Sequence, residues 1–580
     1  MNHARSALLK VFSATQLRTL NTAKVACHHG FEKAPFIIDV WIFSGRFDIL
    51  WEIMKQNIQD KRLLRSTFAV SAPTLLSRIL GYIRDMLQAL YLGTSRSADA
   101  FTIAYVIPNL LRRLTGEGAM TAAFIPIFTQ IKEKEKREEL WRFANAFFFN
   151  LTLIMAFLMV LGILLAPFLV KIIAVGFKEF QGKWELTVVL TRIMFPYIFL
   201  ISLAALAMAI LNSFRKFFVP AFTPVLFNLA IIVLALLFAH RAEEPAYVFA
   251  SGVVLGGILQ LGFQIPFLWK HGMRFKPSLD FRHPSVRKVG RLMVPGIFGV
   301  GISQINFAIS RMIASVLEEG SVSSLYYASR VQELTLGLFS IALAIALLPA
   351  FSELASHEDK DGMKRTLVFS LKLISLVTFP AAAGLLILNR PIIQVLYQRG
   401  VFDEMSTAMS ASCLLFFSFG LPFISGAKIL APAFYSLKDT KTPVIVAFFV
   451  MISYIGLSFL LMKPLRVGGI ALALSLSSVL NFILLFMLLQ RKIGPIKKKA
   501  LCLSAGKSLF FAAVMAGAVQ IFLGLVGPES LPFIERLGVL LAAIAIGILV
   551  YVLLHLFFNP EDLQILQTVF SKEKIIKESD

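Results

Sequence analysis

Long apolar runs alternate with short polar connections over almost the whole chain. Runs such as 147–170 and 537–558 are near or above the ~20 residues that a helix needs to cross about 30 Å of hydrocarbon. About fourteen such segments follow Met54, at 65–92, 98–130, 141–170, 186–213, 218–239, 246–269, 288–317, 322–352, 365–389, 405–436, 443–462, 467–490, 502–526 and 535–558. The pattern predicts an all-α polytopic membrane protein. The first, second and eighth segments carry internal charges and are the least apolar.

The composition supports the same class. Of the 580 residues, 57% are hydrophobic and only 16% are charged, whereas soluble domains carry about 25% charged residues. The net charge of +23 would also suit nucleic acid. The basic residues, however, lie in short connections, where they act on membrane topology and on anionic lipid. We therefore expect membrane lipids as partners and no nucleic acid.

The basic residues also predict an orientation. If the N-terminus is cytoplasmic, Lys and Arg are roughly three times as frequent in the inner loops, such as 132–142, 270–291 and 491–499, as in the outer ones. Such an excess in short loops is typical of the cytoplasmic side. The sequence therefore predicts an even number of spans with both termini in the cytoplasm.

An internal repeat divides the segments into two halves. The spaced residues of 77–86 recur at 303–312, and Phe-Pro-Tyr-Ile (195–198) recurs as Leu-Pro-Phe-Ile (421–424), both at an offset of 226 residues. Paired repeats around a central site are the common plan of secondary transporters. We expect two six-helix lobes followed by two extra helices. The predicted divisions are 54–270 for the N-terminal lobe, 271–495 for the C-terminal lobe, 496–560 for the two added helices and 561–580 for a cytoplasmic tail.

Residues 1–53 do not fit this plan. They contain scattered basic residues and one apolar patch, 36–43, that is too short to span a membrane. No basic region, apolar core and cleavage site of a signal peptide can be discerned. We expect this stretch to be disordered or to derive from an upstream start codon, with a regulatory extension as the alternative.

Charged residues inside the membrane segments are the main candidates for function, because a charge at bilayer depth is costly unless it lines a water-filled cavity. Three segments hold most of them, and the tenth adds a lysine. The candidates are Arg78, Arg84 and Asp85 in the first; Asp99, Arg112, Arg113 and Glu117 in the second; Arg330 and Glu333 in the eighth; and Lys428.

The arginines indicate an anionic ligand, since guanidinium stays charged and grips phosphate oxygens in a bidentate manner. We predict a pyrophosphate site formed by arginines from both lobes, with the acidic residues holding them or acting in gating. Simpler readings stay open. Arg84 with Asp85, or Arg330 with Glu333, could be structural ion pairs, and Arg112 and Arg113 could be interface anchors. Glycine and proline interruptions in the first two segments suit either bending or tight helix packing.

Signals for covalent catalysis are missing from the sequence. It contains no GxxxxGK[ST] loop for a nucleotide and no HExxH motif. The three cysteines, Cys27, Cys413 and Cys502, are widely spaced and form no CxxC pair, so we expect neither a metal site nor disulfides. We therefore expect a protein that is not an enzyme and has no cofactor.

Several multi-residue blocks, in order from about Met54 to the last span, resemble the MurJ (MviN) family. They are Ser77–Asp85, Ala98–Phe101, Pro108–Arg113, Glu117–Ala119, Ala123–Pro126, Phe195–Ile198, Gly320–Ser323, Tyr326–Ala328, Leu430–Ser436 and Lys441–Pro443. Members of this family have fourteen helices in two lobes and flip lipid II, the undecaprenyl-pyrophosphate-linked peptidoglycan precursor, to the outer leaflet. The resemblance implies a multi-pass protein of the bacterial inner membrane that acts in peptidoglycan and cell-wall biogenesis, with cell-wall synthesis proteins as possible partners.

The resemblance also implies a central cationic cavity and a groove for the lipid tail beside the last two helices. The family's functional residues map onto the arginines and carboxylates named above, with Ser323 also at a cavity position. One departure is Ser329, where many members carry Asp before the arginine of the eighth helix. The family further suggests coupling to membrane potential or a cation, but the seventh span offers no clear ion site.

Two other functions compete with a lipid II flippase. A flippase for another polyprenyl-linked oligosaccharide, or a cation-coupled drug exporter, would share the fold, but a drug exporter needs an acidic cavity and this one is predicted to be basic. A scaffold that only recruits cell-wall enzymes would not need intramembrane arginines. Substitution of Arg78 or Arg330 by Ala separates the scaffold from both transporters.

Overall fold

The computed structural model describes residues 58–112, 120–496, 498–527 and 531–559. The chain divides into two units, Met1–Ala72 and Pro73–Asp580, and the division falls inside the first described helix, beside Pro73. Residues 1–53 and the tail 561–580, for which the sequence made predictions, lie outside the described residues. The account below concerns the second unit.

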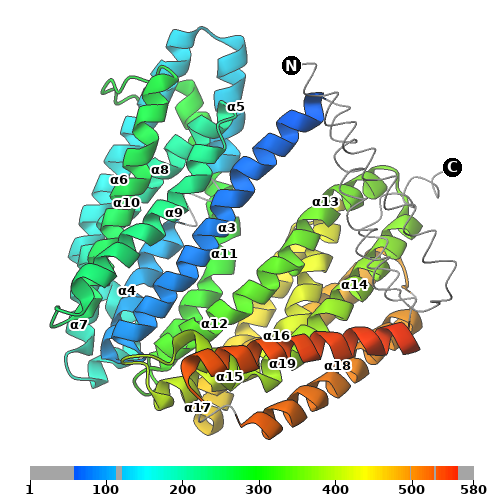
Figure 1. The fold of residues 1–580 in the computed structure, drawn as a ribbon. Coiled ribbons are helices and arrows are strands. Elements are labelled where there is room, and N and C mark those ends of the chain that lie inside the picture. Colours follow the sequence, from blue (N-terminus) through cyan, green and yellow to red (C-terminus); the bar gives the residue numbers. More distant parts are fainter. Residues whose placement is uncertain (1–57, 113–119, 497, 528–530, 560–580) are drawn as a thin grey trace, which may run out of the picture. The chain divides into compact units, whose positions relative to one another are not determined.

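Every element in the described part of the chain is a helix (Figure 1). The elements of the first half are α3 (Ile58–Leu92), α4 (Arg96–Arg112), α5 (Met120–Lys134), α6 (Arg137–Ile173), η2 (Val175–Glu179), α7 (Lys183–Met194), α8 (Pro196–Ser213), α9 (Phe218–Leu234), η3 (Ala235–Ala239) and α10 (Pro245–Lys270). Those of the second half are α11 (Pro284–Ala314), α12 (Ser321–Leu338), α13 (Ser340–Ser356), α14 (Lys360–Ile387), α15 (Asn389–Tyr397), α16 (Glu404–Ser436), α17 (Lys441–Ile493), α18 (Lys498–Val526) and α19 (Phe533–Phe558).

These helices confirm the predicted all-α membrane class. By length and apolar composition, 9 helices of the described residues can cross a membrane, and α12 with α13 would form a tenth, bent span. The helices α3, α4 and α11 lie in predicted spans but do not meet this criterion: α4 has only 17 residues, and charged and polar residues interrupt α3 and α11. The arrangement is compatible with fourteen spans.

The longest helix, α17, covers two of the predicted spans. Arg466 interrupts it with a left-handed φ of 48° and a ψ of −131°. A Cβ at Gly469 would lie only 2.2 Å from the carbonyl oxygen of Leu461. The chain therefore folds back on itself at this turn, and only glycine permits so close an approach of the two backbone segments. This turn matches the predicted gap between 443–462 and 467–490.

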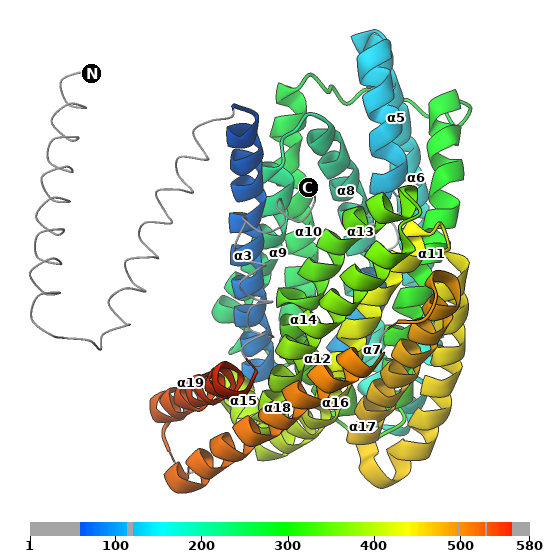
Figure 2. The same cartoon turned by 90° about the vertical axis from the view of Figure 1, so that its right-hand side faces the viewer.

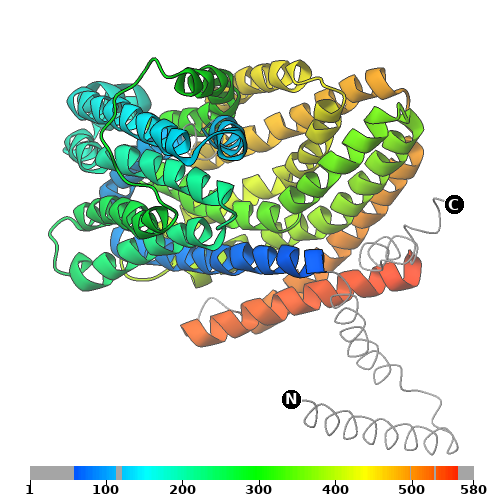
Figure 3. The same cartoon turned by 90° about the horizontal axis from the view of Figure 1, so that it is seen from above.

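The packing of the second unit follows the order of the helices. Helices α4 to α10 pack on one another, and α12 to α17 do likewise, while α11 contacts both α5 and α6 of the first set and α17 of the second. Figure 3 shows the two sets lying on opposite sides of this unit. Because the lobes meet at few helices, residues carried by α3, α4, α11 and α12 are placed where the two sets face each other. The lobe boundaries themselves stay a prediction.

The last two helices form a separate layer. Helices α18 and α19 pack side by side, and both contact α14 (Figure 2). Phe511 and Met515 of α18 meet Leu376 of α14 and Tyr551 of α19 in a buried cluster. This agrees with the predicted pair of added helices.

Candidate functional site

Two hollows lie where the two sets of helices face each other. Their volumes are ≈ 260 and ≈ 760 Å³. They share seven lining residues, namely Arg84, Asn228, Arg311, Tyr326, Ser329, Arg330 and Glu333. The shared side chains come from α3, α9, α11 and α12. Because they line both hollows, we treat the two as one central cavity that is divided by a charged partition.

The partition is built around Asp85, whose side chain is fully buried. The carboxylate oxygen Oδ1 accepts hydrogen bonds from Arg84 Nη2 at 2.7 Å and from the Tyr326 hydroxyl at 2.9 Å. The other oxygen, Oδ2, accepts one from Arg330 Nε at 2.9 Å. We call Arg84, Asp85, Tyr326 and Arg330 the Asp85 cluster. It joins α3 to α12 through one carboxylate and two guanidinium groups.

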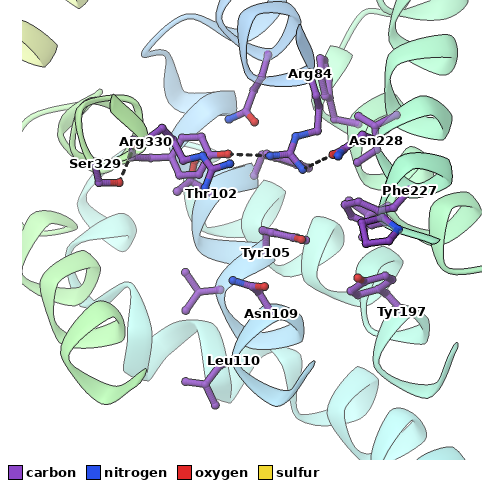
Figure 4. Close-up of a pocket in the computed structure, with 18 of the residues that line it drawn as sticks. Arg84, Thr102, Tyr105, Asn109, Leu110, Tyr197, Phe227, Asn228, Ser329 and Arg330 are labelled. Atoms are coloured by element: carbon purple, nitrogen blue, oxygen red, sulfur yellow. Dashed lines mark hydrogen bonds between the residues drawn. The ribbon is translucent and has the colours of Figure 1, made fainter. Parts of the chain in front are cut away.

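The two arginines differ in how fully their donors are used. Arg84 is also held by Asn228, whose amide oxygen accepts a hydrogen bond from Nη1 at 3.0 Å. Figure 4 shows Arg84 and Arg330 approaching from opposite sides, with Asn228 beside Arg84. Arg330 donates through Nε to Asp85 and through Nη1 to Glu333 at 2.8 Å, which leaves Nη2 available. The side chain of Arg330 is 30% exposed against 14% for Arg84, so Arg330 is the more accessible to a ligand.

Positive charge predominates on the cavity wall. Among the described residues, the larger hollow is lined by Arg78, Lys428 and the shared arginines Arg84, Arg311 and Arg330, whereas Glu333 is the one acidic residue of this lining. Among the described residues, no carboxylate forms an ion pair with Arg78. A cavity of this sign attracts anions and repels cations.

A second buried carboxylate, Asp99, lies on α4. Its Oδ2 accepts hydrogen bonds from Lys183 Nζ at 2.8 Å and from the backbone N–H of Gly320 at 2.9 Å. Its Oδ1 accepts two from Ser323, one from the backbone N–H at 2.8 Å and one from the hydroxyl at 2.7 Å. All four residues are buried. We call them the Asp99 cluster, which fastens α4 and α7 to the start of α12.

Further contacts close the same end of the two helix sets. The hydroxyl of Tyr327 donates to the carbonyl oxygen of Gly93 at 3.1 Å, and Thr94 Oγ1 lies 2.8 Å from Ser406 Oγ. Asp403 begins α16, and hydrogen bonds from the backbone N–H and hydroxyl of Ser406 lower the pKa of its carboxyl group. The turn between α3 and α4 is thus held against α12 and α16, so the cavity is sealed at this end.

The structure brings together part of the predicted site. Arg78, Arg84, Arg330, Glu333 and Lys428 line the cavity, with Asp85 directly behind its wall. Ser323 does not line it, because the hydroxyl is buried against Asp99; its predicted cavity position is wrong in this conformation. The side chain of Arg112, and all of Arg113 and Glu117, lie outside the described residues.

Lys183 of the Asp99 cluster and two residues of the cavity lining, Asn228 and Arg311, were not predicted. Lys183 begins α7 and its partner Asp99 is distant in the sequence, so no local pattern indicated the pair. Asn228 looks like one polar residue in an apolar span. Arg311 could have been found, because the repeat offset of 226 places it opposite Asp85 (85 + 226 = 311), which makes the matching positions of the two halves opposite in charge.

The departure at Ser329 has a clear structural setting. Its hydroxyl donates to the carbonyl oxygen of Tyr326 at 2.8 Å, and its side chain lines both hollows. Arg330 nevertheless keeps two carboxylate partners, Asp85 and Glu333. The serine therefore removes negative charge from the cavity wall without leaving Arg330 unpaired.

Together the two sets of helices, the sealed end and the cationic cavity define an α-helical membrane transporter. The comparisons with known proteins extend this to a family. The family model for lipid II flippase MurJ matches residues 88–559. A probable lipid II flippase MurJ of Vibrio cholerae is 38% identical over 437 residues, which are 74% of this chain and 83% of that protein. The lipid II flippase MurJ of Burkholderia cenocepacia is 37% identical over 434 residues, 74% of this chain and 84% of the relative. The chain belongs to the MurJ lipid II flippase family.

Solved structures agree with this assignment. One of lipid II flippase MurJ in an inward closed conformation matches with a TM-score of 0.70 at 28% identity and covers 85% of this chain and 99% of that one. An inward-facing multidrug transporter of the MATE family matches with a TM-score of 0.61 at 14% identity, over 73% of this chain and 95% of its own, and shows the fold alone. The bacterial relatives and the apolar helices identify a multi-pass protein of the bacterial inner membrane.

Proposed function

We propose that this chain flips lipid II from the cytoplasmic to the outer leaflet by alternating access, with the pyrophosphate bound in the central cavity. The observation that carries the proposal is the charge of the cavity wall, whose described residues include five cationic side chains and one acidic one (Arg78, Arg84, Arg311, Arg330 and Lys428, against Glu333). A diphosphate carries several negative charges and matches such a wall. A cationic drug does not.

In this proposal some arginines contact the ligand and others position their neighbours. Arg330 and Arg78 have donors and exposure to spare, so they contact the pyrophosphate. Arg84 is held by Asp85 and Asn228 and keeps the carboxylate oriented. Bidentate contacts to phosphate are among the strongest hydrogen bonds that a side chain makes. We include Arg112 and Arg113 in the binding set as predicted from the sequence, with Glu117 as a gating charge.

The sealed end would be the outer one. The loop charges favour a cytoplasmic N-terminus and C-terminus, and on that orientation the turn between α3 and α4 faces outward. The Asp99 cluster then serves as the outer gate, which lipid II entering from the inner leaflet finds closed. Opening requires the two helix sets to separate there and approach each other at the inner end.

The test is transport by the full chain in two settings. In a strain depleted of its own lipid II flippase, the wild type should restore growth and Arg330→Ala should not. Purified protein in proteoliposomes should move lipid II, with Arg330→Ala at least about tenfold slower, as expected for loss of a charge-assisted bidentate contact. Arg330→Lys keeps the positive charge but loses the bidentate donor geometry, so its transport rate should lie between those of the wild type and Arg330→Ala.

A matched control is Arg241→Ala, because Arg241 is exposed and lies outside the cavity lining. It should behave as the wild type in both assays. A well-inserted wild type that moves no lipid II would refute the flippase, and growth supported equally by Arg330→Ala would favour a scaffold role.

A further inference from the structure

A third cavity lies away from the central one, between α15 and the first turn of α19. Its volume is ≈ 340 Å³, and it is lined by Gln394, Gln398, Arg399, Phe533 and Arg536. The residues come from two elements that contact each other. The turn that carries Arg399 continues to Val401, whose N–H donates to the carbonyl oxygen of Leu90 at 3.1 Å. The cavity therefore lies beside the sealed end of the transporter.

The two arginines in this cavity have only neutral partners. Arg399 donates to the carbonyl oxygen of Val395 and its guanidinium carbon lies 4.6 Å from the centre of the Phe533 ring. Arg536 donates to Gln398 Oε1 at 3.3 Å and to the carbonyl oxygen of Leu531. Among the described residues no carboxylate forms an ion pair with either guanidinium. Two positive charges thus share one cavity without an ion pair to a described carboxylate, although Glu404 accepts a hydrogen bond from Gln398 Nε2 at 2.8 Å beside them.

A buried amide points to a ligand as well. Gln394 is only 7% exposed and lines the cavity. Within the described part of the chain its side chain makes no hydrogen bond. Since its amide atoms are not fully buried, they reach the cavity, where an anion would supply an acceptor for the N–H groups.

The position of the cavity favours an anion that belongs to a lipid. Phe533 and Ile534, at the start of α19, are 48% and 79% exposed, and α19 continues as an apolar, span-length helix. The cavity is therefore at the end of a membrane-spanning helix, at the depth of the headgroups rather than in open water. Arginine at this depth commonly binds phosphate while its stem rests on apolar groups.

We propose that the cavity formed by Gln394, Arg399 and Arg536 binds the phosphate group of a lipid at the membrane interface. Placing this lipid in the outer leaflet rests on the orientation given under the proposed function. The existence of the site does not depend on that orientation. Two lipids carry this chemistry, a membrane phospholipid and a polyprenyl pyrophosphate such as the translocated lipid.

The experiment is native mass spectrometry of the full chain in detergent, titrated separately with phosphatidylglycerol, undecaprenyl pyrophosphate, diacylglycerol and inorganic phosphate. The variant Arg399→Gln/Arg536→Gln should bind at least one phosphate-bearing lipid about tenfold more weakly or worse, because two charge-assisted donors are lost. Diacylglycerol, which has no phosphate, should be unaffected. The control is Arg241→Gln, an exposed arginine far from both cavities in sequence.

All titrations are repeated in an Arg330→Ala background, which weakens the central site and leaves this one. A loss confined to phosphatidylglycerol identifies a phospholipid, and a loss confined to undecaprenyl pyrophosphate identifies the translocated lipid. Unchanged affinity for both lipids, or a loss seen only with inorganic phosphate, overturns the proposal. The single variants Arg399→Gln and Arg536→Gln, each expected to weaken lipid binding, decide the matter if the double variant does not fold. These binding outcomes can be interpreted even if the wild type does not transport lipid II.

Discussion

The Asp85 and Asp99 clusters use the same kind of group, a carboxylate buried between the two helix sets, in opposite ways. Asp99 is saturated by four hydrogen bonds, one of them from Lys183, and every member of the cluster is buried. Asp85 is shared by two arginines that border a cavity, and one of them, Arg330, has a donor group, Nη2, with no partner among the described residues. A saturated, neutral cluster can only hold helices together. A cluster with excess charge beside a cavity can also bind.

The largest effect should come from breaking the Asp99 cluster. Asp99→Asn leaves Lys183 charged, with 1% of its side chain exposed, and removing one partner of a buried pair costs about 3–5 kcal/mol. We expect a marked fall in the unfolding temperature of the purified protein. Adding Lys183→Met should recover much of it, because the unpaired charge is gone. Equal unfolding temperatures for Asp99→Asn and the wild type would contradict the contrast drawn above.

Asp85→Asn should reduce transport more than stability, whereas Asp99→Asn should mainly reduce stability. Both arginines border the cavity, and Arg330 keeps Glu333 while Arg84 keeps Asn228, so we expect a stability loss of only about 1–3 kcal/mol. Lipid II transport in proteoliposomes should fall about tenfold or more, since the carboxylate that holds the two guanidinium groups together across the cavity is lost. A variant that unfolds as readily as Asp99→Asn would show that Asp85 is mainly structural.

The contrast between the clusters also explains what the sequence could predict. Apolar run length placed the helices, and the cost of intramembrane charge singled out Arg84, Asp85, Asp99 and Arg330. The sequence could not show which partner each carboxylate takes. Asp99 pairs with Lys183, 84 positions away, and such pairing depends on how α4, α7 and α12 pack. For the same reason Ser323 was assigned to the cavity when it belongs to the other cluster.

Asn228 tests how far Arg84 depends on being positioned. Asn228→Leu removes the acceptor of Arg84 Nη1 and the donor to the carbonyl oxygen of Ser77. We expect transport to fall about threefold to tenfold, in line with the loss of one or two hydrogen bonds, with the cavity charge unchanged. Asn228→Asp adds a negative charge beside Arg84 and should lower undecaprenyl pyrophosphate binding further than Leu does. The reverse order in a binding titration would argue against an anionic ligand.

Ser329→Asp restores the acid that many family members carry and adds a second carboxylate to the cavity wall. Arg330 already has two acidic partners, so we expect little gain in stability. Binding of undecaprenyl pyrophosphate should weaken by about threefold to tenfold, as expected for one added like charge at a partly solvated site. Ser329→Asn, of similar size and without the charge, is the control. Weakening by both variants alike would point to size rather than charge.

The smallest effect should come from Ser323→Ala. It removes one of the four donors to Asp99 and leaves both backbone N–H groups and Lys183 in place. The net value of one such bond is about 0.5–1.5 kcal/mol, enough to shift the balance between the sealed and open states of this end several-fold without unfolding the protein. The shift can be measured as thiol labelling of a cysteine introduced at Thr102, which lines the smaller hollow behind this end. Ser323→Thr keeps the hydroxyl and should label as the wild type does. If Ser323→Ala labels no faster than Ser323→Thr, the hydroxyl does not help to keep the outer end closed, and the Asp99 cluster holds through its lysine and backbone donors alone.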